Sequence, residues 1–154
     1  MSATLIADFI DRVPQAFREG DPTVTTKDLE VDNVLLLQSL FQAIAQGDFA
    51  AFAELLAEDV SMEILGTSTI PFLGAWQSRQ EVAEAVRTNF AMIEEQRPML
   101  RSIVAQGNTV VVEGCEQGRL RGAELDYDVQ WFQFHTFSGG KLVRMRQIVT
   151  DTRS

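Results

Sequence analysis

The side chain best suited to acid–base chemistry in this sequence is His135, the single histidine of the chain. Imidazole has an ordinary pKa near neutrality, so His135 could move a proton without help from its surroundings. A carboxylate would have to orient the ring, and Glu63, Glu113 and Asp151 are the candidates. The alternative is structural: His135 lies close to the Gly139-Gly140 turn, where a histidine can be solvated or hydrogen-bonded to backbone.

The segment that contains His135 has the alternation of a half-buried strand. The apolar members are Tyr127, Val129 and Trp131, and the polar members are Asp126, Asp128 and Gln130. Because side chains along a strand point alternately to its two faces, the odd-numbered face is predicted to lie inward, with Gln133 and His135 on it. Phe132 and Phe134 then lie on the outer face, where large exposed aromatics usually mark a partner surface. We therefore expect a homodimer formed through this face.

The other candidate carboxylates can each be interpreted in two ways. Glu63 is either an exposed or salt-bridged side chain, or a pocket carboxylate with a raised pKa if a one-residue bulge turns it inward. Glu113 shares a strand face with Cys115. If that face were buried, Glu113 would need a partner such as Arg101 or Arg119.

The elements that must position these groups are helices first and strands afterwards. Apolar spacing and capping residues predict helices over residues 4–17, from 26 or 28 to 46, 49–58 and 79–96. Valine, isoleucine and aromatic residues between glycine turns predict strands over residues 60–65, 99–106, 109–120, 124–137 and 141–151. This order indicates an α+β fold in one domain, residues 1–154, with residues 1–30 as a helical extension.

Composition excludes several classes of function. The chain has 22 acidic and 13 basic residues, a formal net charge of -9, so nucleic acids and anionic membrane surfaces are not expected partners. No apolar run is long enough to span a bilayer, and we expect a cytoplasmic protein. One cysteine, Cys115, and one histidine give no spacing for a metal site, and no phosphate-binding loop is present. We expect neither a metal nor a cofactor.

Three segments together carry a family resemblance. They are "FQAIAQGDFAAFAELLAEDVSMEI", "PFLGAWQSRQEVAEAV" and "GGKLVRMRQIVTD", at residues 41–64, 71–86 and 139–151. In this order they resemble the nuclear transport factor 2-like superfamily, and within it the SnoaL-like branch, which includes polyketide cyclases and is related to ketosteroid isomerase. The resemblance covers residues 34–151. It implies a cone-shaped α+β barrel, with helices packed on a strongly curved, mainly antiparallel sheet around an apolar cavity, and commonly a dimer.

The resemblance also tests whether the isomerase chemistry is present. Those enzymes use a tyrosine on a helix and an acid on a strand as an oxyanion hole, and an aspartate as the base. With the chain anchored on Gly47-Asp48, the tyrosine position falls on Leu40 and the base on Ile64, while the acid position falls near Gln133. None of these three side chains transfers a proton at neutral pH. The resemblance therefore implies a pocket wall at these positions.

Other pocket positions follow from the same resemblance. Phe72 and Trp76 lie in the segment that covers the cavity in the family, where Ser78 replaces a common glycine. Asp151 lies near the place where some SnoaL-like cyclases have a catalytic aspartate, although a solvent-exposed carboxylate at the rim is the simpler interpretation. The expected pocket residues are Leu40, Ile64, Phe72, Trp76, Tyr127, Trp131, Gln133, His135, Met145 and Gln147.

Three hypotheses of function remain open at this point. The first is a small-molecule-binding protein with an apolar cavity for a polyketide-, steroid- or terpenoid-like ligand. The second is an isomerase, cyclase or hydratase that uses His135 with a pocket carboxylate, Glu63 or Asp151. The third is a dimeric accessory or interaction domain without catalysis. Contact between His135 and a carboxylate inside a cavity would favour the second hypothesis.

Overall fold

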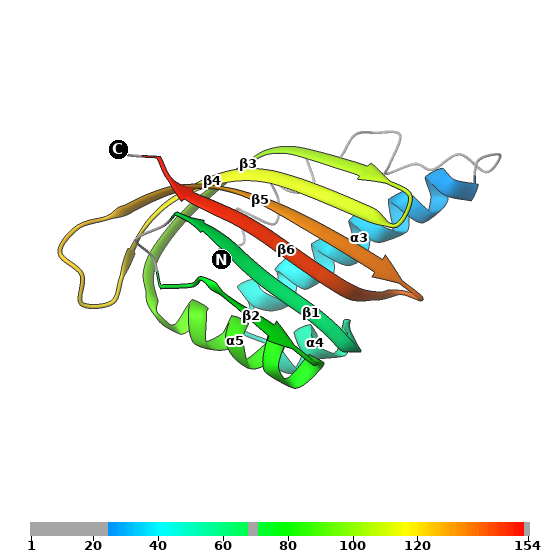
Figure 1. Ribbon diagram of the computed structural model, residues 1–154, viewed down its shortest axis with the longest axis horizontal. Coiled ribbons are helices and arrows are strands. Elements are labelled where there is room, and N and C mark those ends of the chain that lie inside the picture. Colours follow the sequence, from blue (N-terminus) through cyan, green and yellow to red (C-terminus); the bar gives the residue numbers. More distant parts are fainter. Residues whose placement is uncertain (1–24, 68–70, 153–154) are drawn as a thin grey trace.

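The computed structural model describes residues 25–67 and 71–152. The elements, labelled as in Figure 1, are α3 (Thr25–Ala45), α4 (Phe49–Glu54), β1 (Leu56–Thr67), β2 (Gly74–Gln77), α5 (Arg79–Ala91), β3 (Ile93–Gln106), β4 (Thr109–Leu120), β5 (Tyr127–Ser138) and β6 (Lys141–Asp151). The helix predicted over residues 4–17 lies outside the described residues. Within the described ranges, no helix is long and apolar enough to cross a membrane.

The strands form one curved sheet in the order β2-β1-β6-β5-β4-β3. All neighbours pair antiparallel except β1 and β6, which are parallel, so the sheet is mixed and β2 and β3 are its open edges. Figure 1 shows α3 crossing the sheet diagonally, with α4 and α5 beside the end that carries β1 and β2. The prediction of an α+β fold with helices packed on a strongly curved, mainly antiparallel sheet is confirmed.

Helix α3 buries one side and ends at a glycine, as its sequence indicates. Val34, Leu37 and Phe41 repeat at three- and four-residue spacing and are all buried. The chain leaves the helix through Gly47, whose φ of 70° lies in the left-handed region that glycine adopts without strain. Asp48 then caps α4, accepting a hydrogen bond from the Ala51 amide at 3.0 Å. The predicted break between the two helices is therefore present.

The short helix ends earlier than its sequence predicts. Residues 56–58 were expected to be helical, but β1 begins at Leu56. Leu56 is fully buried and pairs with Leu142 on β6, and the Leu142 amide donates to the Leu55 carbonyl at 2.9 Å. This pairing joins residues far apart in the sequence, so local helix propensity could not reveal it.

The fourth predicted helix is also shorter, and the next strand is longer. Helix α5 ends at Ala91 and β3 begins at Ile93, so Gln96 and Pro98 belong to a strand. A proline in a strand removes one backbone donor, which the sheet tolerates because β3 is an edge strand. The prediction that the helix continues to residue 96 was wrong for residues 93–96, and Gln96 is a residue of the sheet.

The segment before α5 contains a short strand, β2, which lies outside the strand ranges predicted from the sequence. Strand β2 pairs with β1, aligning Trp76 with Met62. Ser78 follows with a φ of 90°, a conformation that is costly for any residue other than glycine. Its hydroxyl accepts the Glu81 amide at 3.2 Å, so the residue caps α5 in compensation. This explains how serine occupies a position where the family commonly has glycine.

Candidate functional site

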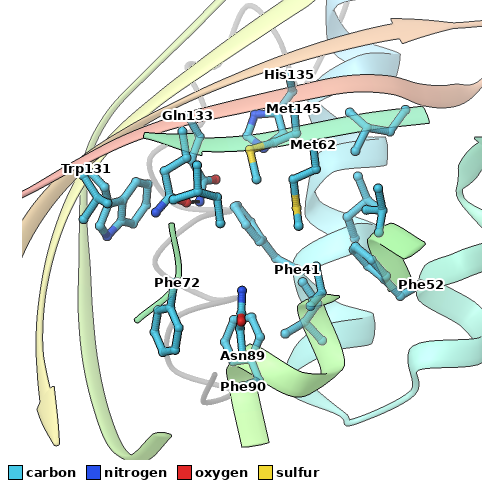
Figure 2. Close-up of a pocket in the computed structure, with 18 of the residues that line it drawn as sticks. Phe41, Phe52, Met62, Phe72, Asn89, Phe90, Trp131, Gln133, His135 and Met145 are labelled. Carbon is cyan, nitrogen blue, oxygen red and sulfur yellow. Dashed lines mark hydrogen bonds between the residues drawn. The ribbon is translucent and has the colours of Figure 1, made fainter. Parts of the chain in front are cut away.

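A cavity of about 140 Å³ lies between the sheet and helices α3 and α5, and its walls are mostly apolar. Figure 2 shows Gln133 and His135 on one side of it, with Phe41 near its centre and Asn89 and Phe90 on the other side. A surface hollow shares four of the lining residues of this cavity, namely Ile44, Phe90, Ile93 and Gln96. The cavity and this hollow therefore share a wall where α3 ends and β3 begins.

Strand register arranges the inner face of the sheet in rows across the strands. One row is Val110, His135, Met145 and Met62, and the next is Val112, Gln133, Gln147 and Ile64. The following row is Gly114, Trp131 and Val149, and the last is Glu116, Val129 and Asp151. Because side chains on one face recur every second residue, neighbouring rows are about 7 Å apart. The polar groups of the cavity are thus spread along its length.

Eight of the ten expected pocket residues line this cavity. The apolar ones are Leu40, Ile64, Phe72, Trp131 and Met145, and the polar ones are Gln133, His135 and Gln147. The inward alternation predicted for residues 127–137 is present in β5, where residues 127, 129, 131, 135 and 137 are buried. A register irregularity lies only at the end of this strand, between Thr136 and Phe137.

The other two expected pocket residues, Trp76 and Tyr127, are not among the residues that line the cavity. The indole of Trp76 folds back along its own strand, so that a side chain at Gly74 would meet its ring carbons at 2.9 Å. Tyr127 is buried, and its hydroxyl donates to Glu116 Oε2 at 2.5 Å. Tyr127 therefore does not line the cavity itself, but its hydroxyl holds Glu116, a carboxylate that does.

His135 is only 3% exposed and packs against two aromatic rings. Phe41 approaches it edge-on, with ring centroids 6.3 Å apart, and Phe137 stacks on it at 6.4 Å. The nitrogen Nδ1 lies 3.3 Å from the Val110 carbonyl oxygen. Burial lowers the pKa of His135 to about 4, although the contact with Val110 acts in the opposite direction. At neutral pH the ring is uncharged.

The carboxylates proposed to orient His135 lie elsewhere. Glu63 is on the outer face, where its Oε1 accepts a hydrogen bond from Arg146 Nε at 2.9 Å. Glu113 accepts the Ser102 hydroxyl at 2.8 Å, also outside the cavity. Asp151 ends β6 and is not among the lining residues. Among the residues that the structure describes, no carboxylate makes a hydrogen bond or ion pair with His135.

Gln133 and Gln147 form an amide pair in the cavity wall. Gln133 Nε2 donates to Gln147 Oε1 at 2.8 Å, and both side chains line the cavity. Gln133 Oε1 is buried, and none of the residues that the structure describes donates a hydrogen bond to it. A buried acceptor without a partner costs about 1–3 kcal/mol, so a hydrogen-bond donor placed in the cavity would relieve this cost.

Glu116 is the acidic side chain among the described lining residues, and two neighbouring strands hold it. Its Oε2 accepts from Tyr127 on β5, and its Oε1 accepts from Gln96 Nε2 on β3 at 2.9 Å. Burial raises the pKa of Glu116, while the hydrogen bonds from Tyr127 and Gln96 act in the opposite direction. Burial, and then the nearby Glu116, raise the pKa of Tyr127, which stays protonated.

Comparison with known proteins assigns the family. The family model for the SnoaL-like domain matches residues 37–145, which is more than half of the chain. This chain belongs to the SnoaL-like family. No curated protein matched its sequence significantly. The matched segment runs from the middle of α3 into β6 and includes most of the cavity wall.

Solved structures share the fold of this SnoaL-like domain at low sequence identity. An NTF2-like protein from Burkholderia xenovorans is 23% identical, with a TM-score of 0.66 over 77% of this chain and 89% of that chain. A proposed SnoaL-like polyketide cyclase from Jannaschia sp. is 17% identical, with a TM-score of 0.67 over 79% and 88%. An LEH-like epoxide hydrolase from Mycobacterium tuberculosis is 14% identical, with a TM-score of 0.63 over 79% and 84%. These likenesses establish the fold alone.

Sequence reasoning missed Glu116 and Gln96 in this SnoaL-like domain. Gln96 was assigned to a helix, and the inward face of β4 was not identified. A usable signal was present, because Gly114 and Gly118 lie on both sides of Glu116 at two-residue spacing. Glycine inside a strand often marks a close approach of another side chain or backbone.

Proposed function

We propose that this SnoaL-like domain binds a small, mostly apolar organic molecule in the cavity between α3, α5 and the sheet. The observation that carries the proposal is Gln133 Oε1, a buried acceptor without a partner among the described residues, in a cavity whose walls are otherwise mostly apolar. The ligand would place an O–H or N–H group against this oxygen and its apolar body against the surrounding side chains.

The size of the cavity narrows the class of ligand. An apolar cavity of about 150 Å³ holds benzene, whereas pockets for drug-sized ligands measure about 300–1,000 Å³. The cavity of about 140 Å³ therefore suits a single ring or a short branched chain better than a four-ring steroid skeleton. The charges of the lining residues narrow the class of ligand further. His135 is neutral, and no lysine or arginine is among the described lining residues. An anionic ligand would lack a counter-charge.

The contacts of His135 and Glu63 give less support to the alternative function, an enzyme that uses His135 as a general acid or base. His135 is bonded to backbone and its pKa is lowered, so the ring is a weak proton acceptor at neutral pH. Glu63 is paired with Arg146 on the opposite face of the sheet. An enzyme reaction that relies on His135 with Glu63 or Asp151 stays a prediction without a supporting contact.

Benzyl alcohol and toluene test the binding proposal, since they share one ring and differ in one donor group. We expect both to bind in isothermal titration calorimetry and to raise the melting temperature, with benzyl alcohol about tenfold tighter because it can donate to Gln133 Oε1. The double variant Q133L/Q147L should lose that difference and keep its stability, because it removes both partners of the amide pair. Absence of binding by both compounds would overturn the proposal.

We also propose that the outer face of the sheet pairs with a second copy of the chain. Phe132 and Phe134 are 37% and 41% exposed, and the register aligns Phe132 with Ile148 and Leu65 in one apolar row. The same face carries the ion pair of Arg146 with Glu63. Two copies related by a two-fold axis can bury their apolar rows against each other. Each copy then presents one positive and one negative side chain to the other copy.

The proposed dimer gives a prediction for Phe134. The variant F134E should sediment as a monomer in analytical ultracentrifugation at concentrations where the wild type is a dimer, because it places a charge on this face beside the apolar row of Phe132. L35E, on α3 and away from this face, is a control in which an apolar residue of similar exposure is replaced, 47% against 41%. A monomeric wild type, or a dimeric F134E, would contradict this interface.

A further inference from the structure

A carboxylate site is built into two neighbouring strands in the wall of the cavity. On β4, Gly114, Glu116 and Gly118 share the inner face, and they pair with Trp131, Val129 and Tyr127 of β5. A side chain at position 114 would lie 2.5 Å from the Trp131 indole, and one at position 118 would lie 2.5 Å from the Tyr127 hydroxyl oxygen. The two glycines thus make room for two aromatic rings, one on each side of Glu116.

The Glu116 carboxylate is held in place by two neutral hydrogen-bond donors. Its two oxygens accept hydrogen bonds from Tyr127 and Gln96, which fix its orientation. The nearby arginines Arg97 and Arg119 form their ion pairs with other acids, namely Glu94, Glu95 and Asp126. Among the described residues, no cation pairs with Glu116. A carboxylate of this kind gains most from a ligand that carries a positive charge.

The aromatic side chains of the cavity suit an organic cation. Trp131 lies over Gly114, two residues from Glu116 on the same face, and Phe72 and Phe90 line the same cavity. Aromatic faces attract ammonium groups, most strongly when water is excluded. Gln96, which donates to Glu116, also lines the surface hollow beside the cavity.

We propose that Glu116, held between Tyr127 and Gln96 and flanked by Trp131, binds the protonated amine of a small organic ligand whose apolar body fills the cavity. This inference rests on the proposed binding function and assigns the ligand to the class of small primary or secondary amines. Glu116 supplies the counter-charge, Tyr127 and Gln96 orient it, and the aromatic walls enclose the cation. Glu116 and Gln133 then recognise hydrogen-bond donors in two different parts of the same cavity.

Calorimetry on the full chain at neutral pH tests the inference with benzylamine, benzyl alcohol and toluene as probes. Benzylamine should bind at least tenfold more tightly than benzyl alcohol. The variant E116Q should lose this advantage and still bind toluene, because glutamine keeps the shape of the side chain and removes its charge. The control E113Q, on the outer face of the same strand, should keep the wild-type preference.

A second variant separates the site from a merely structural effect. Y127F removes the donor to Glu116 and keeps the ring, so benzylamine affinity should fall severalfold with toluene affinity unchanged. Equal affinity for benzylamine and benzyl alcohol, or a preference that survives E116Q, would overturn the amine inference and leave the binding proposal intact. If none of the probes binds, both proposals fail.

Discussion

Wild-type protein should lose about 3 kcal/mol of unfolding free energy between pH 7 and pH 4 through His135 alone, and the variant H135F should lack this component. The ring is buried, and burial lowers its pKa to about 4, against an ordinary value of 6.5. A difference of 2.5 pKa units corresponds to about 3 kcal/mol at 1.36 kcal/mol per unit. This is a large share of the stability of an ordinary domain.

The sign of this pH effect depends on whether the folded or the unfolded chain binds a proton at His135 at the higher pH. As the pH falls below about 6.5, the unfolded chain binds a proton at His135 while the folded chain does not, so unfolding becomes more favourable. The loss accumulates until the pH approaches the folded pKa of about 4 and then levels off. At neutral pH the group costs nothing, because the ring is uncharged in both states.

Urea unfolding at pH 7, 6, 5 and 4 measures this effect as a difference between wild type and H135F. Phenylalanine keeps an aromatic ring between Phe41 and Phe137 and removes the titrating group, while the carboxylates common to both proteins cancel. The stability of wild type relative to H135F should fall by about 3 kcal/mol from pH 7 to pH 4, whatever their offset at pH 7. Parallel curves would show that the His135 site protonates while folded.

The substitution G118A should destabilise the protein by about 1–3 kcal/mol, more than most single methyl additions on a sheet. The added methyl group would lie 2.3 Å from the Glu95 carbonyl oxygen on β3 and 2.5 Å from the Tyr127 hydroxyl oxygen. Backbone cannot rotate away as a side chain can, so β3 or the Tyr127 ring must shift. Either movement disturbs the hydrogen bonds that hold Glu116.

Urea unfolding of G118A and of the control Q117A checks this prediction. Gln117 is the exposed neighbour on the same strand, where its side chain bonds Asp128 at 3.1 Å, so Q117A should change stability by less than about 1 kcal/mol. The site should respond as well: benzylamine affinity should fall in G118A and stay at the wild-type level in Q117A. A stable G118A with wild-type amine affinity would show that Tyr127 and β3 can accommodate the methyl group without disturbing the site.

The sequence predicted those parts of the structure that depend on local patterns. Alternation in β5 set the inward face of Trp131, Gln133 and His135, because a strand buried on one face selects apolar residues at every second position. The helix break at Gly47 followed equally from local rules, since glycine and the aspartate after it end one helix and cap the next.

The parts that the sequence did not predict depend on partners distant in the chain. Gln96 was placed in a helix because residues 93–96 continue the helical pattern of residues 79–92, whereas pairing with β4 draws them into an edge strand. Glu116 lies in a strand whose two faces each contain valine and one glutamate, so alternation could not select the inner one. The part of the candidate site that holds Glu116 therefore appears only once three strands have been aligned.

The parallel pairing of β1 with β6 has a consequence for the order of folding. Contacts between these strands join residues more than 80 positions apart, as in the pair of Glu63 with Arg146. During synthesis, at about 5–20 residues per second, β1 leaves the ribosome several seconds before its partner exists. For that time Met62 and Ile64 lie on an unpaired strand edge that can associate with other chains. Strand β6 thus joins β1 to the rest of the sheet and ends the period in which the edge of β1 is exposed to other chains.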